Sequence, residues 1–361
     1  MKEIHQDIFD DAFDRRIKAL MDEWQIPGAA IVLIKDGLAP SYRTLSGAGY
    51  SQIKPTTRFP IASCTKLISA LVLGKVLREA GKNLTTRVKE VLPEFELVDR
   101  DATDECTIQD LIAHRCRLPQ YDIFLLRPLE KGEDLMSRLK YLPMTGKLRE
   151  EPHRYNNQAQ QIIYTIIERL TGKSFERCVR EAIFDPLGMA STGFSAADAG
   201  EDFASGYRAV HTPTGMREGL MPVVYGLDNQ GEQMGMAAGR IISTVEDLAK
   251  LLAYLPQDPL WPILSLPPKD FSQSVAKGNI AGQEALGIGS ISISMAGYQM
   301  VGHSGAVAGH RSHLMRIPGL RCGLAVLTNS TEGLDLAYCV EAWVIGKLTG
   351  DESLIDKVYS E

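Results

Sequence analysis

The spacing of apolar and polar residues changes along the chain and predicts different elements in its different parts. Over the first 24 residues, apolar side chains recur at every third or fourth position, which predicts an amphipathic helix. Residues 29–34 form a short apolar run, and residues 42–45 are expected to pair with it as a second strand. The stretch Leu67–Leu77 is apolar nearly all the way round, which indicates a buried helix.

The middle of the chain, from about residue 80 to about residue 260, has mostly helical spacing broken by Pro and Gly. We expect Gly172 to end one of its helices and Ser243 to cap another before Glu246. After about residue 284 the apolar period becomes two. This part predicts a final helix over Leu334–Leu348 and four strands before it: LGIGSISISM, YQMVG, HRSHLMRIP and CGLAVLTNS, the last two joined by a turn at Pro318-Gly319.

These elements predict an α/β (α+β) fold in which one sheet is built from both ends of the chain. We expect residues 1–66 and 284–361 to form a discontinuous sheet domain, and residues 67–283 to form an inserted, mostly helical domain. The chain has 361 residues, of which 44% are hydrophobic and 23% are charged. This is the composition of an ordinary globular protein, and it excludes a disordered chain or a small protein stabilised mainly by disulfide bonds.

Charge and cysteine usage narrow the expected partners and compartment. The formal net charge is −6 and no long run of Lys and Arg occurs, which argues against a nucleic-acid partner. The first residues are charged every few positions and no window holds 18 uncharged apolar residues, so we expect neither a signal peptide nor a membrane span. The six cysteines lack metal-ligand spacing and are expected to be free thiols of a cytoplasmic protein without a metal: Cys64, Cys106, Cys116, Cys178, Cys322 and Cys339.

The candidate chemistry begins with Ser63-Cys64-Thr65-Lys66, where the first strands end and the buried helix begins. A spacing of three places Ser63 and Lys66 on the same helical face, one turn apart. An amine at the start of so apolar a helix is partly desolvated, which lowers its pKa and suits it to act as a base. The helix N-terminus also favours an oxyanion near Ser63. Two further S-x-x-K stretches, Ser137–Lys140 and Ser274–Lys277, do not open a buried helix and are interpreted as chance.

Two later motifs supply complementary groups. Tyr155-Asn156-Asn157 is the only Y-x-N in the chain and stands just before a predicted helix. A phenol beside a lysine can move protons to a leaving group, and the Asn157 amide can fix a substrate oxygen. His303-Ser304-Gly305 ends a predicted strand, where Gly305 permits close approach of a ligand. The backbone N–H of Ala306 could join that of the candidate nucleophile as an oxyanion hole.

In this order, Ser-x-x-Lys, Tyr-x-Asn and His-x-Gly resemble the motifs of the serine β-lactamase and penicillin-binding protein superfamily, especially its class C-like branch of esterases, D-aminopeptidases and related acyltransferases. The resemblance covers nearly the whole chain. It implies a β-lactamase/transpeptidase-like fold, with an antiparallel sheet flanked by helices. Five other stretches support it: Ile26-Pro27-Gly28, Thr171–Phe175, Pro186–Met189, Ala238-Gly239-Arg240 and Ser243–Leu248.

The resemblance also implies an acyl-enzyme mechanism without a metal or organic cofactor. Ser63 would attack a carbonyl carbon, and Lys66 and Tyr155 would share the general-base and general-acid roles in an order that the sequence leaves open. Asn157 would position the substrate, and His303 would line the pocket where many relatives have lysine.

Two departures from the family pattern stand out. A histidine carries much less positive charge than a lysine at pH 7, so we expect true β-lactamase activity to be weak or absent. Residues 114–119 read His-Arg-Cys-Arg-Leu-Pro where relatives usually have a His-Thr-Ser-Gly-Leu-Pro-like stretch, so this loop lacks the relatives' glycine.

Three rival sites fit the sequence less well. Cys64 points about 100° away from Ser63 around the helix, so we expect it to pack rather than react. His310 and His313 fall on opposite faces of a strand, which argues against a metal pair. Residues 302–306 nearly match a G-x-S-x-G nucleophile elbow, but the next segment is another strand and the only later histidines are too close in sequence. An α/β-hydrolase is therefore rejected.

We expect a serine hydrolase that cleaves an ester or amide bond of an intracellular small molecule through an acyl-Ser63 intermediate. An acyltransferase with a thioester donor, an acyl-carrier protein among the possible donors, would use the same residues because only the acceptor differs from water. A non-catalytic ligand sensor or scaffold is the third alternative, and the intact Ser63, Lys66 and Tyr155 set argues against it. The acyl group, the acceptor and the oligomeric state stay open.

Overall fold

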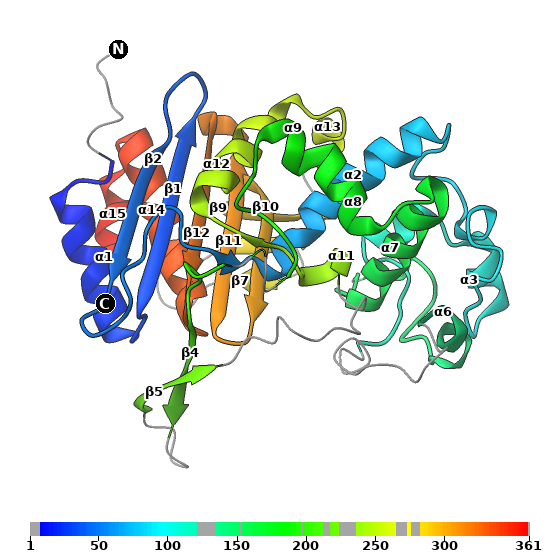
Figure 1. Cartoon of the computed structure of the whole chain (residues 1–361), viewed down its shortest axis with the longest axis horizontal. Helices are drawn as coiled ribbons and strands as arrows, with labels where there is room; N and C mark the ends of the chain where they lie inside the picture. Colours follow the sequence, from blue (N-terminus) through cyan, green and yellow to red (C-terminus); the bar gives the residue numbers. More distant parts are fainter. Residues whose placement is uncertain are drawn as a thin grey trace.

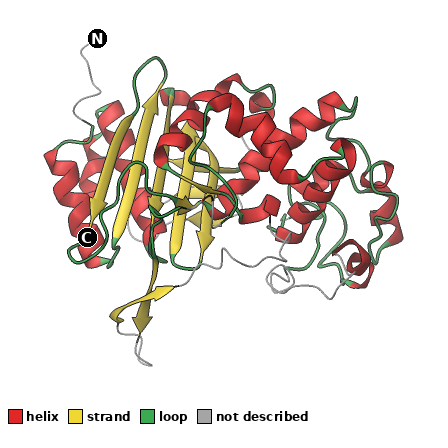
Figure 2. Cartoon of the chain, viewed as in Figure 1, coloured by secondary structure: helices red, strands yellow, loops and turns green. Residues whose placement is uncertain are grey.

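One large antiparallel sheet lies beside a mostly helical half of the molecule in this computed structural model (Figure 1, Figure 2). The structure describes residues 8–120, 135–151, 153–195, 198, 200–211, 217–223, 236–264, 273–275 and 282–359. The strands of the sheet follow the order β2-β1-β12-β11-β10-β9-β8-β7. Their bounds are β1 (Gly28–Lys35), β2 (Ser41–Ser46), β7 (Gln273–Val275), β8 (Gly282–Leu286), β9 (Ile291–Met295), β10 (Tyr298–Val307), β11 (His310–Ile317) and β12 (Cys322–Thr328).

Two small antiparallel sheets and the helices complete the described elements. β3 (Phe59–Pro60) pairs with β6 (Ile242–Ser243), and β4 (Gly206–His211) pairs with β5 (Arg217–Val223). The α-helices are α1 (Asp11–Glu23), α2 (Thr65–Glu79), α3 (Arg100–Glu105), α4 (Ile108–Ile112), α6 (Leu135–Arg138), α7 (Asn157–Thr171), α8 (Phe175–Val179), α9 (Asp185–Leu187), α11 (Met236–Gly239), α12 (Val245–Tyr254), α13 (Trp261–Leu264), α14 (Gly333–Thr349) and α15 (Glu352–Tyr359).

The sheet joins the two ends of the chain, as the sequence predicts. β1 lies between β2 and β12, and Ala29 of β1 is paired with Thr328 of β12. Every strand pair in this sheet is antiparallel. The expected α/β (α+β) fold with an antiparallel sheet flanked by helices is therefore confirmed, and the division into two domains stays a prediction.

The apolar run in β1 is continuous because both faces of this strand are buried. Ile31 and Leu33 pack in a core that α1 and α14 share with the sheet. Ala30 and Val32 point to the other face, where α2 and α12 form the second core. A strand that is covered on both sides has no solvent face to carry polar residues, so its sequence shows no alternation.

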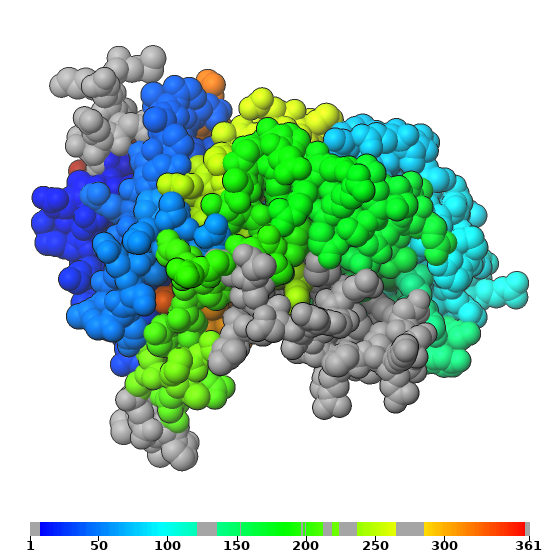
Figure 3. Space-filling view, in the orientation of Figure 1, coloured from blue at the N-terminus to red at the C-terminus, as the bar shows by residue number. Residues whose placement is uncertain are grey.

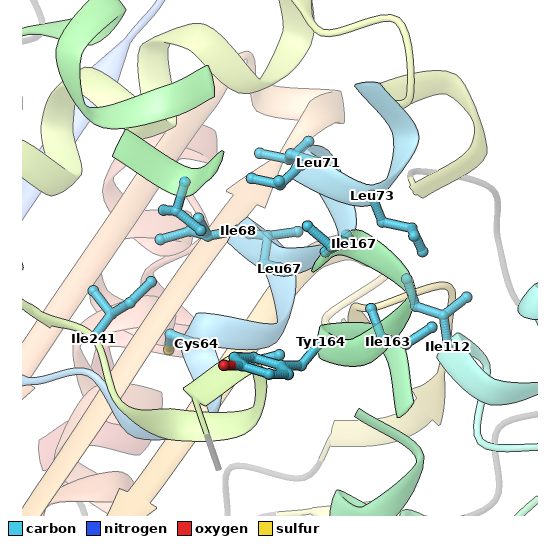
Figure 4. Packing of buried hydrophobic residues seen from close by; sticks show 14 of the residues in the cluster. Cys64, Leu67, Ile68, Leu71, Leu73, Ile112, Ile163, Tyr164, Ile167 and Ile241 are labelled. Atoms are coloured by element: carbon cyan, nitrogen blue, oxygen red, sulfur yellow. The ribbon is translucent and has the colours of Figure 1, made fainter. Parts of the chain in front are cut away.

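The buried helix predicted over Leu67–Leu77 is α2. Its side chains are buried on every face along most of its length, which explains its lack of a polar stripe. Leu67 and Leu71 of α2 belong to the same cluster as Ile163 and Ile167 of α7 (Figure 4). This packing holds α2 against α7, the two helices that directly follow the Ser63 and Tyr155 motifs.

Helix boundaries agree with the sequence analysis in part. The opening helix is confirmed over α1, while residues 1–7 lie outside the described residues. Gly172 ends α7 in the left-handed region at φ +66°, as predicted. The prediction that Ser243 caps α12 is wrong, because Ser243 lies in β6 and the Thr244 side chain accepts the hydrogen bond from Asp247 N at 3.1 Å.

Three elements differ from the sequence expectation. The stretch LGIGSISISM is not one strand, because a turn with Gly289 at φ +63° separates the end of β8 from β9. The middle of the chain, expected to be helical, contains the β4–β5 hairpin, which projects from the body of the molecule (Figure 3). A short helix, α15, follows the predicted final helix and packs on it.

Candidate active site

Ser63 lies in a single turn of 3-10 helix, η1 (Ala62–Cys64), between β3 and α2. Hydrogen bonds hold this turn from two sides: Ile61 N donates to the Ile241 carbonyl oxygen at 2.9 Å, and Ser312 Oγ donates to the Ile61 carbonyl oxygen at 2.6 Å. Ala62 adopts φ +44°, a conformation that costs a residue with a Cβ about 1 kcal/mol or more. The chain therefore holds Ser63 on a strained turn that the surrounding strands fix in place.

Lys66 and Tyr155 both contact the hydroxyl of Ser63. Lys66 Nζ lies 3.0 Å from Ser63 Oγ, and the Tyr155 hydroxyl lies 2.8 Å from the same atom. The Lys66 ammonium also stands 4.9 Å from the centre of the Tyr155 ring. The structure thus brings together three residues that the sequence placed in two separate motifs, 92 residues apart.

Lys66 is fully buried on the first turn of α2. Its ammonium donates to the Ala238 carbonyl oxygen of α11 at 2.7 Å as well as to Ser63. By contrast, Ser137 and Lys140 of the second S-x-x-K stretch lie in α6 and the following turn, where Lys140 pairs with Glu96 at 3.5 Å. Ser274 of the third stretch lies in β7, and Lys277 lies outside the described residues.

The segment before α7 orients Tyr155. The Asn156 side chain caps α7 by accepting from Ala159 N at 2.8 Å, and its amide nitrogen donates to the Leu118 and Pro119 carbonyl oxygens at 3.0 Å each. Asn156 N donates to Nδ1 of His114 at 3.1 Å. Asn156, buried in this way, anchors the loop of residues 114–119 to the start of α7. It thereby orients Tyr155, the residue before it in the chain.

The loop that lacks the relatives' glycine adopts the left-handed conformation without it. Arg117 has φ +54° and is almost fully buried. Its guanidinium donates to the Thr145 carbonyl oxygen at 2.9 Å, and Arg117 O accepts from Thr145 N at 2.8 Å. These contacts offset the conformational cost that a non-glycine residue carries at positive φ.

A cavity of about 730 Å³ opens at Ser63. All four predicted substrate-binding residues line it, and Tyr155 lines it with them. Its described lining is Ser63, Gln120, His153, Arg154, Tyr155, Asn157, Ala285, Leu286, Ile291, His303, Ser304, Gly305, Ala306 and Leu334. His153, Arg154 and β8 were not predicted to line the site, because neither a motif nor a periodicity in the sequence marks them.

Gly305 makes the close approach of β10 to the Ser63 turn possible. A methyl group at this position would overlap Ser312 Oγ and the Ile61 carbonyl oxygen and would press on the Ala62 side chain. The next residue, Ala306, is exposed and lines the cavity. Gly305 was expected to permit the close approach of a ligand. In the structure, the part that approaches Gly305 closely is the turn of the same chain that carries Ser63.

His303 is a buried, neutral imidazole. Burial and the nearby Lys66 ammonium lower its pKa to about 3. Its Nδ1 lies 2.5 Å from the Ser304 carbonyl oxygen, which can only accept, so Nδ1 carries the ring hydrogen. The pKa of His114, whose ring centre lies 4.7 Å from that of Tyr155, is also held well below its usual value by burial and by Lys66. These two histidines therefore add no positive charge near Ser63 at neutral pH.

Cys64 packs, as expected. It is fully buried, and its thiol contacts the His303 carbonyl oxygen at 2.9 Å and Ser312 Oγ at 3.2 Å. Burial raises its pKa to about 12, so the thiolate form that a nucleophile needs is absent at neutral pH.

Ser304 has a histidine partner that the sequence analysis excluded. The β10–β11 hairpin places His313 directly opposite Ser304, with Ser304 Oγ 2.9 Å from His313 Nδ1. His313 Nε2 lies 2.6 Å from Glu341 Oε1 on α14. The expectation that the later histidines lie too close in sequence to pair with Ser304 is wrong, because a tight hairpin brings residues nine apart face to face. The rejected elbow itself stays rejected, since β11 and not a helix follows.

His310 and His313 have separate partners. His310 contacts the Ala204 carbonyl oxygen at 2.8 Å through Nε2 and the Ala308 carbonyl oxygen at 3.0 Å through Nδ1. Across the described part of the chain, no group of three or more His, Cys, Asp or Glu side chains is placed to hold a metal ion. Within the same residues, no helix has both the length and the apolar character to cross a membrane.

A family model described as Beta-lactamase matches residues 13–341 of the chain, which includes every residue of the site. The chain belongs to the beta-lactamase family. Two curated relatives are similar to it: "Unguisins hydrolase ungD'" of Aspergillus campestris is 29% identical over 94% of this chain, and "Protein flp" of Staphylococcus aureus is 24% identical over 88%. The alignments span 64% and 62% of those two proteins, so the chain matches somewhat less than two thirds of their length.

Solved structures show the same fold. The octameric penicillin-binding protein homologue from Pyrococcus abyssi has a TM-score of 0.74 and 24% identity, covering 93% of this chain and 78% of that one. D-amino acid amidase from Ochrobactrum anthropi SV3, complexed with L-phenylalanine, has a TM-score of 0.71 and 19% identity, covering 95% of this chain and 100% of the amidase. The β-lactamase/transpeptidase-like fold is therefore confirmed.

Proposed function

We propose that this member of the beta-lactamase family is a serine hydrolase that cleaves an ester or amide bond of a small molecule through an acyl-Ser63 intermediate. The observation that supports it is the double contact on Ser63 Oγ, 3.0 Å from Lys66 Nζ and 2.8 Å from the Tyr155 hydroxyl. A nucleophile with an adjacent base and acid is what acyl transfer requires. The cavity of about 730 Å³ at this serine has the size of a small-molecule site.

The proposed reaction starts from the form in which one of the two groups has lost a proton, Lys66 as the free amine or Tyr155 as the phenolate. Ser63 Oγ then bonds to the carbonyl carbon of the substrate while its proton passes to that group. The carbonyl oxygen becomes an oxyanion, and the backbone N–H groups of Ser63 and Ala306 are the donors we assign to it. The leaving alcohol or amine then takes the proton as its bond to carbon breaks. Water repeats the sequence on the acyl-enzyme and releases the acid and free Ser63.

The remaining predicted residues have positioning roles in this proposal. Asn157 opens α7 and lines the cavity, where its amide is placed to fix a substrate oxygen. His303 fills the wall beside Lys66 without adding charge, since its pKa of about 3 keeps it neutral. A β-lactam carboxylate therefore lacks a permanent cation at this position, which supports weak β-lactamase activity.

Steady-state hydrolysis of p-nitrophenyl acetate and butyrate tests the proposal. We expect Ser63→Ala to abolish turnover and Tyr155→Phe to lower kcat by about 10²-fold or more, because a missing acid or base group typically costs this much. Tyr164→Phe on α7, where Tyr164 packs on Phe175, is the matched control and should leave turnover unchanged. Full turnover in Ser63→Ala would refute the proposal. Added alcohols or amines that divert the acyl group would indicate transfer rather than hydrolysis.

A further inference from the structure

Arg154 gives the described wall of the cavity a positive charge. Its side chain is exposed, and it directly precedes Tyr155 on the side of the cavity that the segment before α7 forms. The described lining contains no Asp or Glu. Its two histidines, His153 and His303, both have a pKa that burial lowers, so neither adds a positive charge at pH 7.5. The described wall therefore has a cation and no carboxylate to balance it.

The arginines of the neighbouring loop differ from Arg154 in having acidic partners. Arg115 Nε lies 3.4 Å from Asp110 Oδ1. Arg117 Nη2 lies 3.8 Å from Glu150 Oε1. The guanidinium of Arg154 forms no hydrogen bond or ion pair with any of the described residues, although it lies on the wall of a cavity. Its N–H donors are therefore available to a molecule that enters this cavity.

The catalytic pair adds no net charge to the cavity in its reactive form. The proposed reaction starts with one proton removed from Lys66 or Tyr155, which leaves either an amine beside a phenol or an ammonium beside a phenolate. Each of these combinations is neutral as a pair. The charge that a substrate meets on the described wall is thus the positive charge of Arg154, in a chain whose formal net charge is −6.

The cation lies on one side of the cavity only. The sheet contributes Ala285 and Leu286 from β8 and Ile291 from β9, which are apolar, and the buried His303 from β10, which is neutral. An anionic group on a substrate is therefore attracted to Arg154, in the segment before α7, rather than to the third motif on β10.

A guanidinium favours a particular kind of anion. Its N–H groups point in parallel from one plane, and two of them match the two oxygens of a carboxylate. An ammonium group on a substrate would be repelled by the same residue. Among charged substituents, the described wall of the cavity is thus suited to a carboxylate.

We propose that Arg154 binds a carboxylate of the substrate, and that the enzyme therefore prefers esters or amides that carry a free carboxylate on the acyl group or on the leaving group. The inference rests on the proposed function, because the molecule it describes is the one that acylates Ser63. Arg154 is a specificity residue here: it contacts the substrate and exchanges no proton with it.

Two pairs of chromogenic esters test this preference. p-Nitrophenyl hydrogen adipate and its methyl ester differ by a carboxylate on the acyl group. 5-Acetoxy-2-nitrobenzoic acid and its methyl ester differ by a carboxylate on the leaving group. With Ser63→Ala as the blank, we expect kcat/KM of the unsubstituted enzyme to favour the carboxylate in one of the pairs by roughly fivefold, the upper end of what an exposed ion pair supplies. Ratios near unity in both pairs would overturn the inference.

The ratio within the favoured pair is the decisive quantity in the variants. We expect Arg154→Gln to bring it to within about twofold of unity. Lys147→Gln is the matched control, because it removes an exposed positive charge from a nearby residue outside the described cavity lining and should keep the ratio. Sodium chloride at about 0.5 M should lower the ratio of the unsubstituted enzyme by screening the ion pair. An unchanged ratio in Arg154→Gln, or an equal fall in Lys147→Gln, would overturn the assignment to Arg154.

Binding to the Ser63→Ala variant separates this inference from the proposed function. Isothermal titration calorimetry compares two stable amides, adipic acid monoanilide and 3-acetamidobenzoic acid, each with its own methyl ester. We expect one of the acids to bind Ser63→Ala roughly fivefold more tightly than its methyl ester, and Ser63→Ala/Arg154→Gln to lose this difference. Equal affinities within both pairs would overturn the inference. Ester turnover that persists in Ser63→Ala would instead refute the proposed function, and the two affinities would still decide whether Arg154 binds a carboxylate.

Discussion

The ammonium of Lys66 donates to the backbone carbonyl oxygen of Ala238, 2.7 Å away. This contact ties the first turn of α2 to α11, two elements whose bonded residues are 172 positions apart in the chain. It aims a fully buried amine at Ser63, and no other S-x-x-K stretch within the described residues has such a setting. The burial and the contacts of Lys66, rather than the S-x-x-K spacing, identify it as the candidate catalytic lysine.

Replacing Lys66 should remove acyl transfer while the fold persists. In Lys66→Met the side chain still fills the buried space but cannot exchange a proton, so we expect kcat/KM for p-nitrophenyl esters to fall by about 10³-fold. Lys140→Met, in the second S-x-x-K stretch, is the matched control and should retain the activity of the parent enzyme. A Lys66→Met enzyme with more than a tenth of the parent activity would contradict the role assigned to this amine.

Buried histidines should make the protein less stable as the pH falls below 6.5. The folded pKa of His303 is about 3 against 6.5 in the unfolded chain, and burial lowers the pKa of His114 and His310 in the same direction. Between these values the unfolded chain binds protons that the folded chain does not, so stability falls as pH falls. Each such histidine contributes a slope of about 1.4 kcal/mol per pH unit.

Urea unfolding at pH 4.5, 5.0, 5.5 and 6.0 measures this slope. In His303→Gln one titrating group is lost, so we expect the slope of the free energy of unfolding against pH to decrease by about 1.4 kcal/mol per unit. The window lies above the ordinary pKa of aspartate, which limits the carboxylate contribution. Equal slopes for the two proteins would mean that His303 is not buried in its neutral form.

Gly305 should not tolerate a side chain. The added methyl group of Gly305→Ala would overlap Ser312 Oγ and the Ile61 carbonyl oxygen, so β10 has to move away from the turn that carries Ser63. We expect a loss of about 1–3 kcal/mol in stability and a fall of at least tenfold in kcat for p-nitrophenyl esters. Gly319→Ala is the matched control, because its added methyl group would meet only the Tyr298 ring at an ordinary contact distance of 3.7 Å. This variant should change neither quantity by a measurable amount.

All six cysteines should be unreactive in the folded protein. Each is a buried thiol outside any disulfide, and burial raises the pKa to about 12 at Cys64, about 11 at Cys116 and about 12 at Cys322. We expect 5,5′-dithiobis(2-nitrobenzoic acid) at pH 8 to release less than one equivalent of thiolate before unfolding and six equivalents in guanidinium chloride. Rapid release of one or more equivalents from native protein would show an accessible thiolate.

β1 and α2 were predictable because local pattern determines them: their apolar runs reflect burial on all sides. The Ser63 motif was found because it stands immediately before α2. The β4–β5 hairpin was not predicted, because its polar strands are only partly buried and show no clear period of two. Its support is non-local: Tyr207 N donates to the Asn329 carbonyl oxygen at 3.0 Å, beyond the end of β12.

The Ser304–His313 contact could not be read from sequence for a related reason. Its geometry depends on the register of the β10–β11 hairpin, and a shift by one residue would place the two side chains on opposite faces. Glu341 adds a third residue from a helix whose rotation about its axis the sequence leaves open. The left-handed conformation of Arg117 is a similar case, since contacts with Thr145 rather than local preference stabilise it.

Trapping of the acyl group tests the central claim most directly. Intact-protein mass spectrometry after millisecond exposure to p-nitrophenyl butyrate, followed by peptide mapping, should show one butyryl group on Ser63 that decays in water. The adduct should be absent from Ser63→Ala. A butyryl group mapped to another residue, or none in folded protein exposed to esters, thioesters and a fluorophosphonate, would contradict catalysis by Ser63.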